Sequence, residues 1–292
     1  MDAATVDQGL VLSAHAAHRF AHEHCPQMPE GDCSWYHGVW QYFRLLGVTK
    51  TAGGSAAWLD ETLRSAAAEG NIRRALISGA ADDAMALLAL ASFRAVNQPL
   101  ELTVVDRCET PLALARWSAA KRGDAVITYR SNILAFGRSQ SFDLVMTNSF
   151  LGSFTPPRRV ELFTRWASLL RRGGKLVFTN RLRPTSKREA FGFTPEQARS
   201  FCMAVRREAE RLQSVLGLDP VTVEEWARVY AERYRSYPVR NEDEVVELLR
   251  AAGFAPHSVE TARFEGRRSA VAVAGPSVAE QADYLRVIAI RS

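Results

Sequence analysis

The chain has 292 residues, of which 47% are hydrophobic and 24% charged, the composition of a folded globular protein with a sizeable core. The net charge of +5 comes mostly from arginines interleaved with acids, so charge alone does not indicate a nucleic-acid partner. No apolar run reaches the roughly 18 residues of a membrane-spanning helix, no secretory signal is visible, and the four cysteines do not form a disulfide scaffold. We therefore expect a cytoplasmic protein.

The first 70 residues are predicted to be a helical region outside the sheet. Apolar and small residues recur at helical spacing over 11–24, 35–46 and 57–69. Gly47 and Gly70 follow two of these segments, as is typical of the residue after a helix. We expect this region to help cover a substrate.

Five of the six histidines lie in this helical region, close to Cys25 and Cys33. His15, His18 and His22 share one helical face, which is one possible arrangement of metal ligands. Neither a Cys-x-x-Cys pair nor a His-Glu-x-x-His motif accompanies them. The sequence therefore predicts no metal site.

His37 is the candidate catalytic base, together with its neighbour Tyr36. Both stand between Trp35 and Trp40, and burial among rings favours a neutral imidazole that accepts a proton near neutral pH. A hydrogen-bonded core histidine is the alternative interpretation.

Residues 75–106 are predicted to form a strand, a turn of small residues, a helix and a second strand that ends in Asp106. The turn contains Gly79, Ala80, Ala81 and Asp82, whose small side chains let a ligand approach the backbone. Open α/β sheets bind ligands at this end of the strands, and Asp106 stands where an acid accepts both hydroxyls of a ribose. The pattern indicates a nucleoside-containing cofactor.

Further strands are expected at 125–129, 142–147, 175–179, 258–264 and 284–290, with helices between most of them. Residues 184–240 interrupt this alternation with two long helices and are interpreted as an insertion. The fold class is therefore α/β, a Rossmann-like, doubly wound and mostly parallel sheet with an N-terminal helical region and a helical insertion.

Several short motifs follow one another along this part of the chain. A strand and a glycine-containing loop end near Gly79, Asp106 follows the second strand, and Ser131-Asn132-Ile133 follows the third. The fourth strand ends at Asn148, and the segment 169–178 reads LLRRGGKLVF. In this order the motifs of residues 71–292 resemble those of class I S-adenosylmethionine-dependent methyltransferases, although Ile77 replaces the usual acid before the glycine loop.

The resemblance implies a seven-stranded sheet with a terminal hairpin, S-adenosylmethionine as cofactor, and two parts, a lid over 1–70 and a methyltransferase domain over 71–292. It also implies a set of cofactor-binding residues. These are Gly79, Ala80, Ala81, Asp82, Asp106, Arg107, Ser131, Asn132, Ile133, Asn148 and Ser149.

A small-molecule O or N acceptor is the expected substrate, because Asn148 is not followed by the Pro-Pro-aromatic signature of enzymes that methylate nucleic-acid bases. We expect no membrane partner, and a homodimer is possible. Two alternatives remain open: a non-catalytic cofactor-binding or regulatory protein, and an RNA-modifying enzyme that uses the basic run 181–188. A dehydrogenase fits less well, since the loop lacks the glycines that a pyrophosphate needs.

Overall fold

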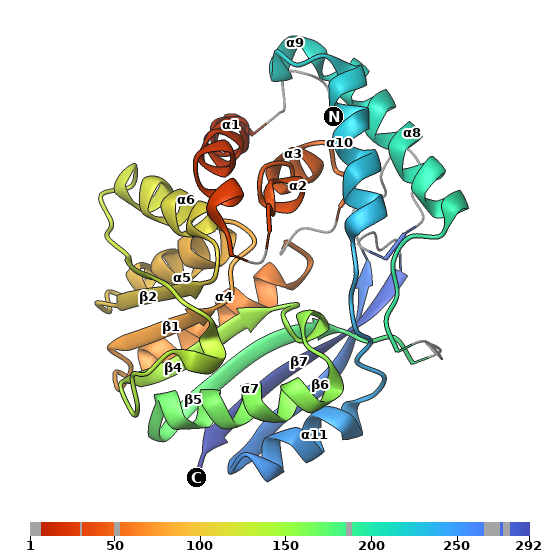
Figure 1. The fold of residues 1–292 in the computed structure, drawn as a ribbon. Helices are drawn as coiled ribbons and strands as arrows, with labels where there is room; N and C mark the ends of the chain where they lie inside the picture. The colour runs from red at the N-terminus through yellow and green to blue at the C-terminus, as the bar shows by residue number, and fades with distance from the viewer. Residues whose placement is uncertain (1–6, 30, 50–52, 185–188, 266–274, 277–280) are drawn as a thin grey trace.

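A seven-stranded sheet with the strand order β3-β2-β1-β4-β5-β7-β6 forms the centre of the molecule (Figure 1). The computed structural model describes residues 7–29, 31–49, 53–184, 189–265, 275–276 and 281–292. The first five strands are parallel, and β7 runs antiparallel between β5 and β6. The predicted mostly parallel sheet with a terminal hairpin is confirmed.

The strands overlap the predicted segments, and β5, β6 and β7 are several residues longer than predicted. Their bounds are β1 (Arg74–Ser78), β2 (Glu101–Asp106), β3 (Ile127–Arg130), β4 (Phe142–Asn148), β5 (Leu170–Arg181), β6 (Phe254–Glu265) and β7 (Gln281–Arg291). The predicted turn at 171–174 belongs instead to β5, because Leu170 pairs with Phe142 and the register then shifts before Leu144. An irregularity of this kind keeps the chain in the sheet where a turn was expected.

Helices cover both faces of the sheet (Figure 1). On one face α4 (Gly53–Ala68), α5 (Ala84–Ala95) and α6 (Glu109–Ala120) pack around buried side chains such as Leu63 and Phe93. On the other face α7 (Pro156–Leu169) and α11 (Glu242–Ala251) pack around Trp166. Because α4 packs on the sheet, part of the region before residue 70 contributes to the core of the α/β layers; the boundary at residue 70 stays a prediction.

Most of the remaining helices form one cap, which we call the lid, beyond the carboxyl ends of the parallel strands (Figure 1). It combines two parts of the chain far apart in sequence: α1 (Gln8–His24), η2 (Cys25–Gln27), α2 (Ser34–His37) and α3 (Trp40–Leu45) with α8 (Pro195–Arg211), α9 (Gln213–Leu216) and α10 (Pro220–Arg233). Phe43, Phe201 and Tyr230 are fully buried in their common core. Burial of these rings supplies much of the free energy that holds the lid together.

The helix predicted over 35–46 is divided at Gly38 and Val39 into α2 and α3. A Cβ atom at Gly38 would lie 2.8 Å from the carbonyl oxygen of Ser34 and 3.1 Å from the Cβ of Ala21 in α1. The glycine therefore permits the close contact between α1 and α2. Within the described ranges, no helix has the length and apolar character needed to span a membrane.

Candidate functional site

A cavity of about 600 Å³ lies at the carboxyl ends of β1, β2 and β4, below the lid. Most of the cofactor-binding residues predicted from the sequence line it. They are Gly79, Ala80, Ala81, Asp106, Arg107, Ser131, Asn132, Ile133, Asn148 and Ser149. The structure therefore brings together residues from four separate loops at the position where open α/β sheets bind ligands.

Asp106, at the end of β2, is held by the backbone on both sides of its carboxylate. The N–H of Ala80 donates to Oδ2 at 2.9 Å, and the N–H of Cys108 donates to Oδ1 at 2.8 Å. Each carboxylate oxygen retains a lone pair for a further donor, so two neighbouring hydroxyls can still be accepted. Burial raises the pKa of Asp106, and the nearby His37 and the two N–H donors oppose that rise.

Gly79, directly after β1, carries the tightest turn of the site. Its φ is +76°, and a Cβ atom there would lie 2.3 to 2.6 Å from ring atoms of Phe150. Its N–H donates to the carbonyl of Val105 at 2.9 Å, which joins the ends of β1 and β2. Only glycine tolerates both the backbone conformation and the ring above it.

The end of β4 contributes a polar edge to the cavity. Asn148 Oδ1 accepts from the Thr179 hydroxyl at 2.6 Å. Ser149 has a positive φ of 55°, and its N–H donates to the Thr179 carbonyl at 2.7 Å.

The loop after β3 contributes Asn132 and Ile133 to the cavity. Ile133 is 4% exposed, and the side chain of Asn132 accepts from the N–H of Leu134. Asn132 therefore caps a short helix as well as lining the cavity.

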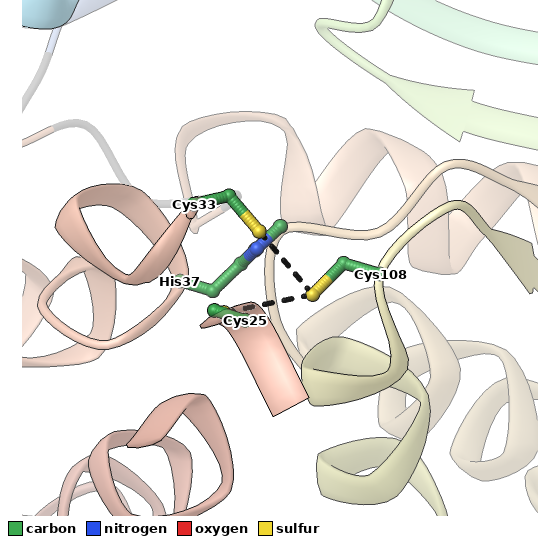
Figure 2. Close-up of side chains that lie close together, drawn as sticks. All are labelled: Cys25, Cys33, His37 and Cys108. Atoms are coloured by element: carbon green, nitrogen blue, oxygen red, sulfur yellow. Dashed lines mark hydrogen bonds between the residues drawn. The ribbon is translucent and has the colours of Figure 1, made fainter. Parts of the chain in front are cut away.

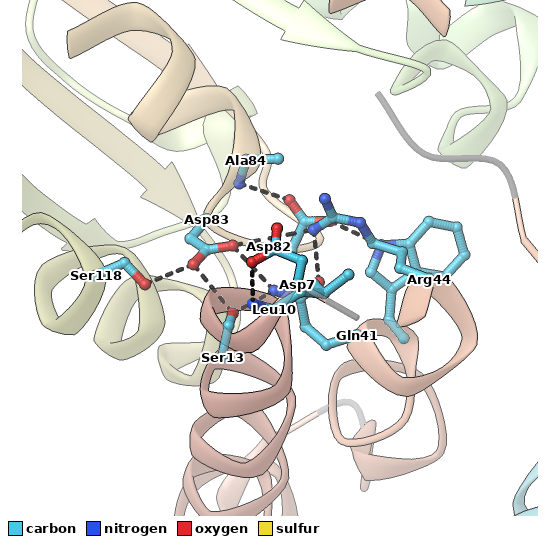
Figure 3. Close-up of polar contacts among 10 residues, drawn as sticks. Asp7, Leu10, Ser13, Gln41, Arg44, Asp82, Asp83, Ala84 and Ser118 are labelled. Carbon is cyan, nitrogen blue, oxygen red and sulfur yellow. Dashed lines mark hydrogen bonds and ion pairs between the residues drawn. The ribbon is translucent and has the colours of Figure 1, made fainter. Parts of the chain in front are cut away.

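Asp82 and Asp83, after the glycine turn, attach the lid to the sheet (Figure 3). Asp82 Oδ2 accepts from Trp40 Nε1 at 2.9 Å and from Arg44 at 2.8 Å. Asp83 is 5% exposed, and its oxygens accept from Gln41, Ser13 and Ser118. Burial and the neighbouring Asp82 raise the pKa of Asp83. Asp82, a predicted cofactor residue, borders only the second cavity described next.

A second cavity of about 180 Å³ adjoins the first along Tyr36, the glycine turn and the end of β4. Its further lining comes from the lid, the end of β5, the insertion and β7, and is rich in rings and arginines: Trp40, Arg181, Arg183, Tyr234 and Tyr284. Burial, and then the nearby Arg181, lower the pKa of Arg183 to about 10. The segment 185–188 of the predicted basic run lies outside the described residues.

The sheet has seven strands and ends in the antiparallel hairpin of β6 and β7, as the sequence resemblance implies. The structure is similar to that of magnesium protoporphyrin IX methyltransferase from Synechocystis PCC 6803 with bound S-adenosylhomocysteine, with a TM-score of 0.52, 14% identity, and coverage of 89% of this chain and 96% of that one. The chain has the class I methyltransferase fold.

A second similar structure is the 1,6-didemethyltoxoflavin-N1-methyltransferase of Burkholderia thailandensis, with a TM-score of 0.48, 19% identity and coverage of 81% of both chains. The fold assignment rests on the first structure and on the strand order. No protein-family model and no curated protein matches this sequence.

On this methyltransferase fold, the predicted catalytic residues Tyr36 and His37 both lie beside the larger cavity. The ring of Tyr36 stacks on Trp40 with centroids 5.4 Å apart, and burial raises its pKa, so its hydroxyl stays protonated at neutral pH. Burial lowers the pKa of His37, but contacts with the Cys108 and Cys25 thiols outweigh burial and raise it to about 10. The base role predicted for His37 stays a prediction.

The aromatic side chains of the lid lie partly along the smaller cavity and partly in the lid core. Tyr36, Trp40 and Tyr234 border the smaller cavity, while Tyr230 is fully buried in the lid core and reaches neither cavity. Sequence reasoning missed Arg44 as the partner of Asp82, because the two residues lie 38 positions apart. It also missed the grouping of three cysteines around His37, because Cys108 follows β2 whereas the other two cysteines lie in the N-terminal part of the lid.

Proposed function

We propose that this protein transfers a methyl group from S-adenosylmethionine to an O or N atom of a small molecule. The observation that carries the proposal is the carboxylate of Asp106, which is fixed by two backbone N–H groups at the edge of a cavity of about 600 Å³. The likeness to a methyltransferase with bound S-adenosylhomocysteine supports the choice of cofactor.

In this proposal the two ribose hydroxyls of the cofactor donate to Asp106, and the adenine lies beside Ile133 and Asn132. The absence of a side chain at Gly79 lets the cofactor approach the backbone closely. The usual acid before the glycine loop is replaced by Ile77, which is 1% exposed, so the amino group of the cofactor has to find another partner.

The smaller cavity is the proposed binding site of the acceptor. S-adenosylmethionine, when bound, would supply its methyl group to a lone pair of the acceptor oxygen or nitrogen and would leave as S-adenosylhomocysteine, with the acceptor's proton released. The protein's main task is to align the two reactants at the junction of the cavities, near Asn148, Ser149 and Tyr36. The rings of Tyr36 and Trp40 favour a planar acceptor.

Calorimetric titration with S-adenosylmethionine and S-adenosylhomocysteine tests this function on the wild type, Asp106→Ala and the control Glu101→Gln. Glu101 is exposed and begins the same strand that Asp106 ends, so its substitution leaves the cavity unchanged. We expect micromolar binding to the wild type and E101Q. Binding to D106A should be at least about tenfold weaker, because hydrogen bonds to charged groups contribute about 1.5–3 kcal/mol each.

Equal affinity of D106A and the wild type, or no binding of either ligand by the wild type, would contradict the proposed cofactor site. Once binding is established, release of S-adenosylhomocysteine measures turnover on a panel of planar phenols and amines. Cofactor binding without turnover on any acceptor would instead favour a non-catalytic, cofactor-binding protein. Strongly salt-dependent binding to RNA would favour the RNA-modifying alternative.

A further inference from the structure

Three cysteines and one histidine meet where the lid contacts the sheet, beside the larger cavity (Figure 2). Cys25 belongs to η2, Cys33 and His37 belong to the segment of α2, and Cys108 lies between β2 and α6. One ligand atom of each residue lies within 4.8 Å of the others. Four side chains of metal-binding type thus converge from three separate parts of the chain.

The distances between the sulfurs fit a single metal ion. Sγ of Cys108 lies 3.6 Å from Sγ of Cys25 and 3.5 Å from Sγ of Cys33. A tetrahedral zinc ion with Zn–S bonds of about 2.3 Å holds its sulfurs about 3.8 Å apart. A disulfide would need its sulfurs at about 2.05 Å, and all four cysteines of the chain are free.

The groups around the four side chains favour cysteine in its thiolate form and leave a ring nitrogen of His37 without a hydrogen-bond partner in the described part of the chain. Cys108 is the N-cap of the 12-residue helix α6, whose N-terminus stabilises negative charge. The Thr110 hydroxyl lies 3.2 Å from Sγ of Cys25, within reach of a supporting hydrogen bond. Nδ1 of His37 is buried and has no hydrogen-bond partner in the described part of the chain, which is costly for a polar atom unless another group completes it.

We propose that Cys25, Cys33, His37 and Cys108 bind one zinc ion. Four protein ligands of the Cys₃His type make a closed, structural site. A [4Fe–4S] cluster is another use of such ligands, but it binds each cysteine to a different iron and so requires sulfurs farther apart. Cys25 and Cys108 are at most 2% exposed, whereas Cys33 and His37 are half-buried and border the cavity, which gives the ion a route of entry.

The ion would attach the N-terminal part of the lid to the loop that follows β2. The N–H of Cys108 donates to Asp106, so a ligand of the ion also fixes the carboxylate at the edge of the cavity. A ring nitrogen bound to zinc does not accept a proton, and therefore this assignment replaces the base role predicted for His37. Zinc binding itself does not depend on the proposed methyl transfer.

The test measures zinc by mass spectrometry in the desalted full-length protein after expression with added zinc. The wild type should contain about one zinc ion per chain, and Cys33→Ser should retain less than about a tenth of that amount. Cys202→Ser is the matched control, because Cys202 is also half-buried but lies in α8, outside the cluster. C202S should keep the wild-type zinc content.

Two further measurements keep the test decisive if C33S folds poorly. Wild-type protein stripped with a chelator and refilled with Co²⁺ should develop the thiolate-to-metal absorption and the strong d–d bands of a tetrahedral sulfur site. His37→Gln should lose zinc at a chelator concentration that leaves the wild type loaded. A wild type without zinc, equal zinc in C33S, a disulfide among the three cysteines, or iron with sulfide in place of zinc would each overturn the proposal.

Discussion

At Gly79 the chain turns with a φ of +76° while the ring of Phe150 covers the position where a side chain would begin. Two costs follow for any other residue: the strain of the left-handed backbone and the displacement of a ring that also borders the cavity. Gly123 carries the first cost alone, since its φ is +74° and a Cβ atom there would meet nothing within 4 Å.

Gly79→Ala should therefore destabilise the protein more than Gly123→Ala. Both variants carry a backbone strain of about 1–2 kcal/mol, and G79A adds an overpacking cost of about 1–3 kcal/mol. Urea unfolding of the two variants measures the difference. Equal unfolding free energies would mean that Phe150 moves aside without cost.

At the scale of elements, Asp143 in β4 holds the start of β1. Its Oδ2 accepts from the N–H groups of Arg73 and Arg74, each at 2.8 Å, and its Oδ1 accepts from Arg171 at the start of β5. Burial raises the pKa of Asp143, but these three donors outweigh it, so the pKa in the folded protein lies below the ordinary value of 3.8.

A carboxyl whose pKa is lower in the folded state stabilises the protein above its unfolded pKa and loses that effect as the pH falls through the folded pKa. Asp143→Asn should therefore lower the free energy of unfolding by about 1–3 kcal/mol at neutral pH. The difference should shrink below the unfolded value of 3.8. Denaturant unfolding from neutral pH to about pH 3 measures it, and a constant difference would contradict the assigned role.

The lid illustrates which elements could be predicted from sequence. Helical spacing predicted α1, α8 and α10 well, because each is long and has one apolar face. It did not predict the division of the segment 35–46, since that depends on the contact of Gly38 with α1. Asp82 was linked to the cofactor by its position after Gly79, but its carboxylate receives donors from Trp40 and Arg44 of the lid.

For the whole molecule, the alternation of strands and helices predicted the fold, and most of the cofactor-binding residues predicted at the ends of the strands line the larger cavity. These features are local, because a parallel strand and the loop after it are adjacent in sequence. The four residues of the candidate zinc site could not be grouped in this way. Cys25 and Cys108 are 83 positions apart, and Cys33 and Cys108 are 75 apart, so only the packing of the lid on the sheet brings them together.

A crystal structure of the protein with S-adenosylhomocysteine tests the central claim most directly. We predict the ribose hydroxyls on Asp106, the adenine beside Ile133, and the sulfur at the junction of the two cavities near Ser149. That arrangement would direct the methyl group of the intact cofactor into the smaller cavity. A ligand bound elsewhere, or one whose sulfur lies away from the smaller cavity, would contradict the proposed methyl transfer.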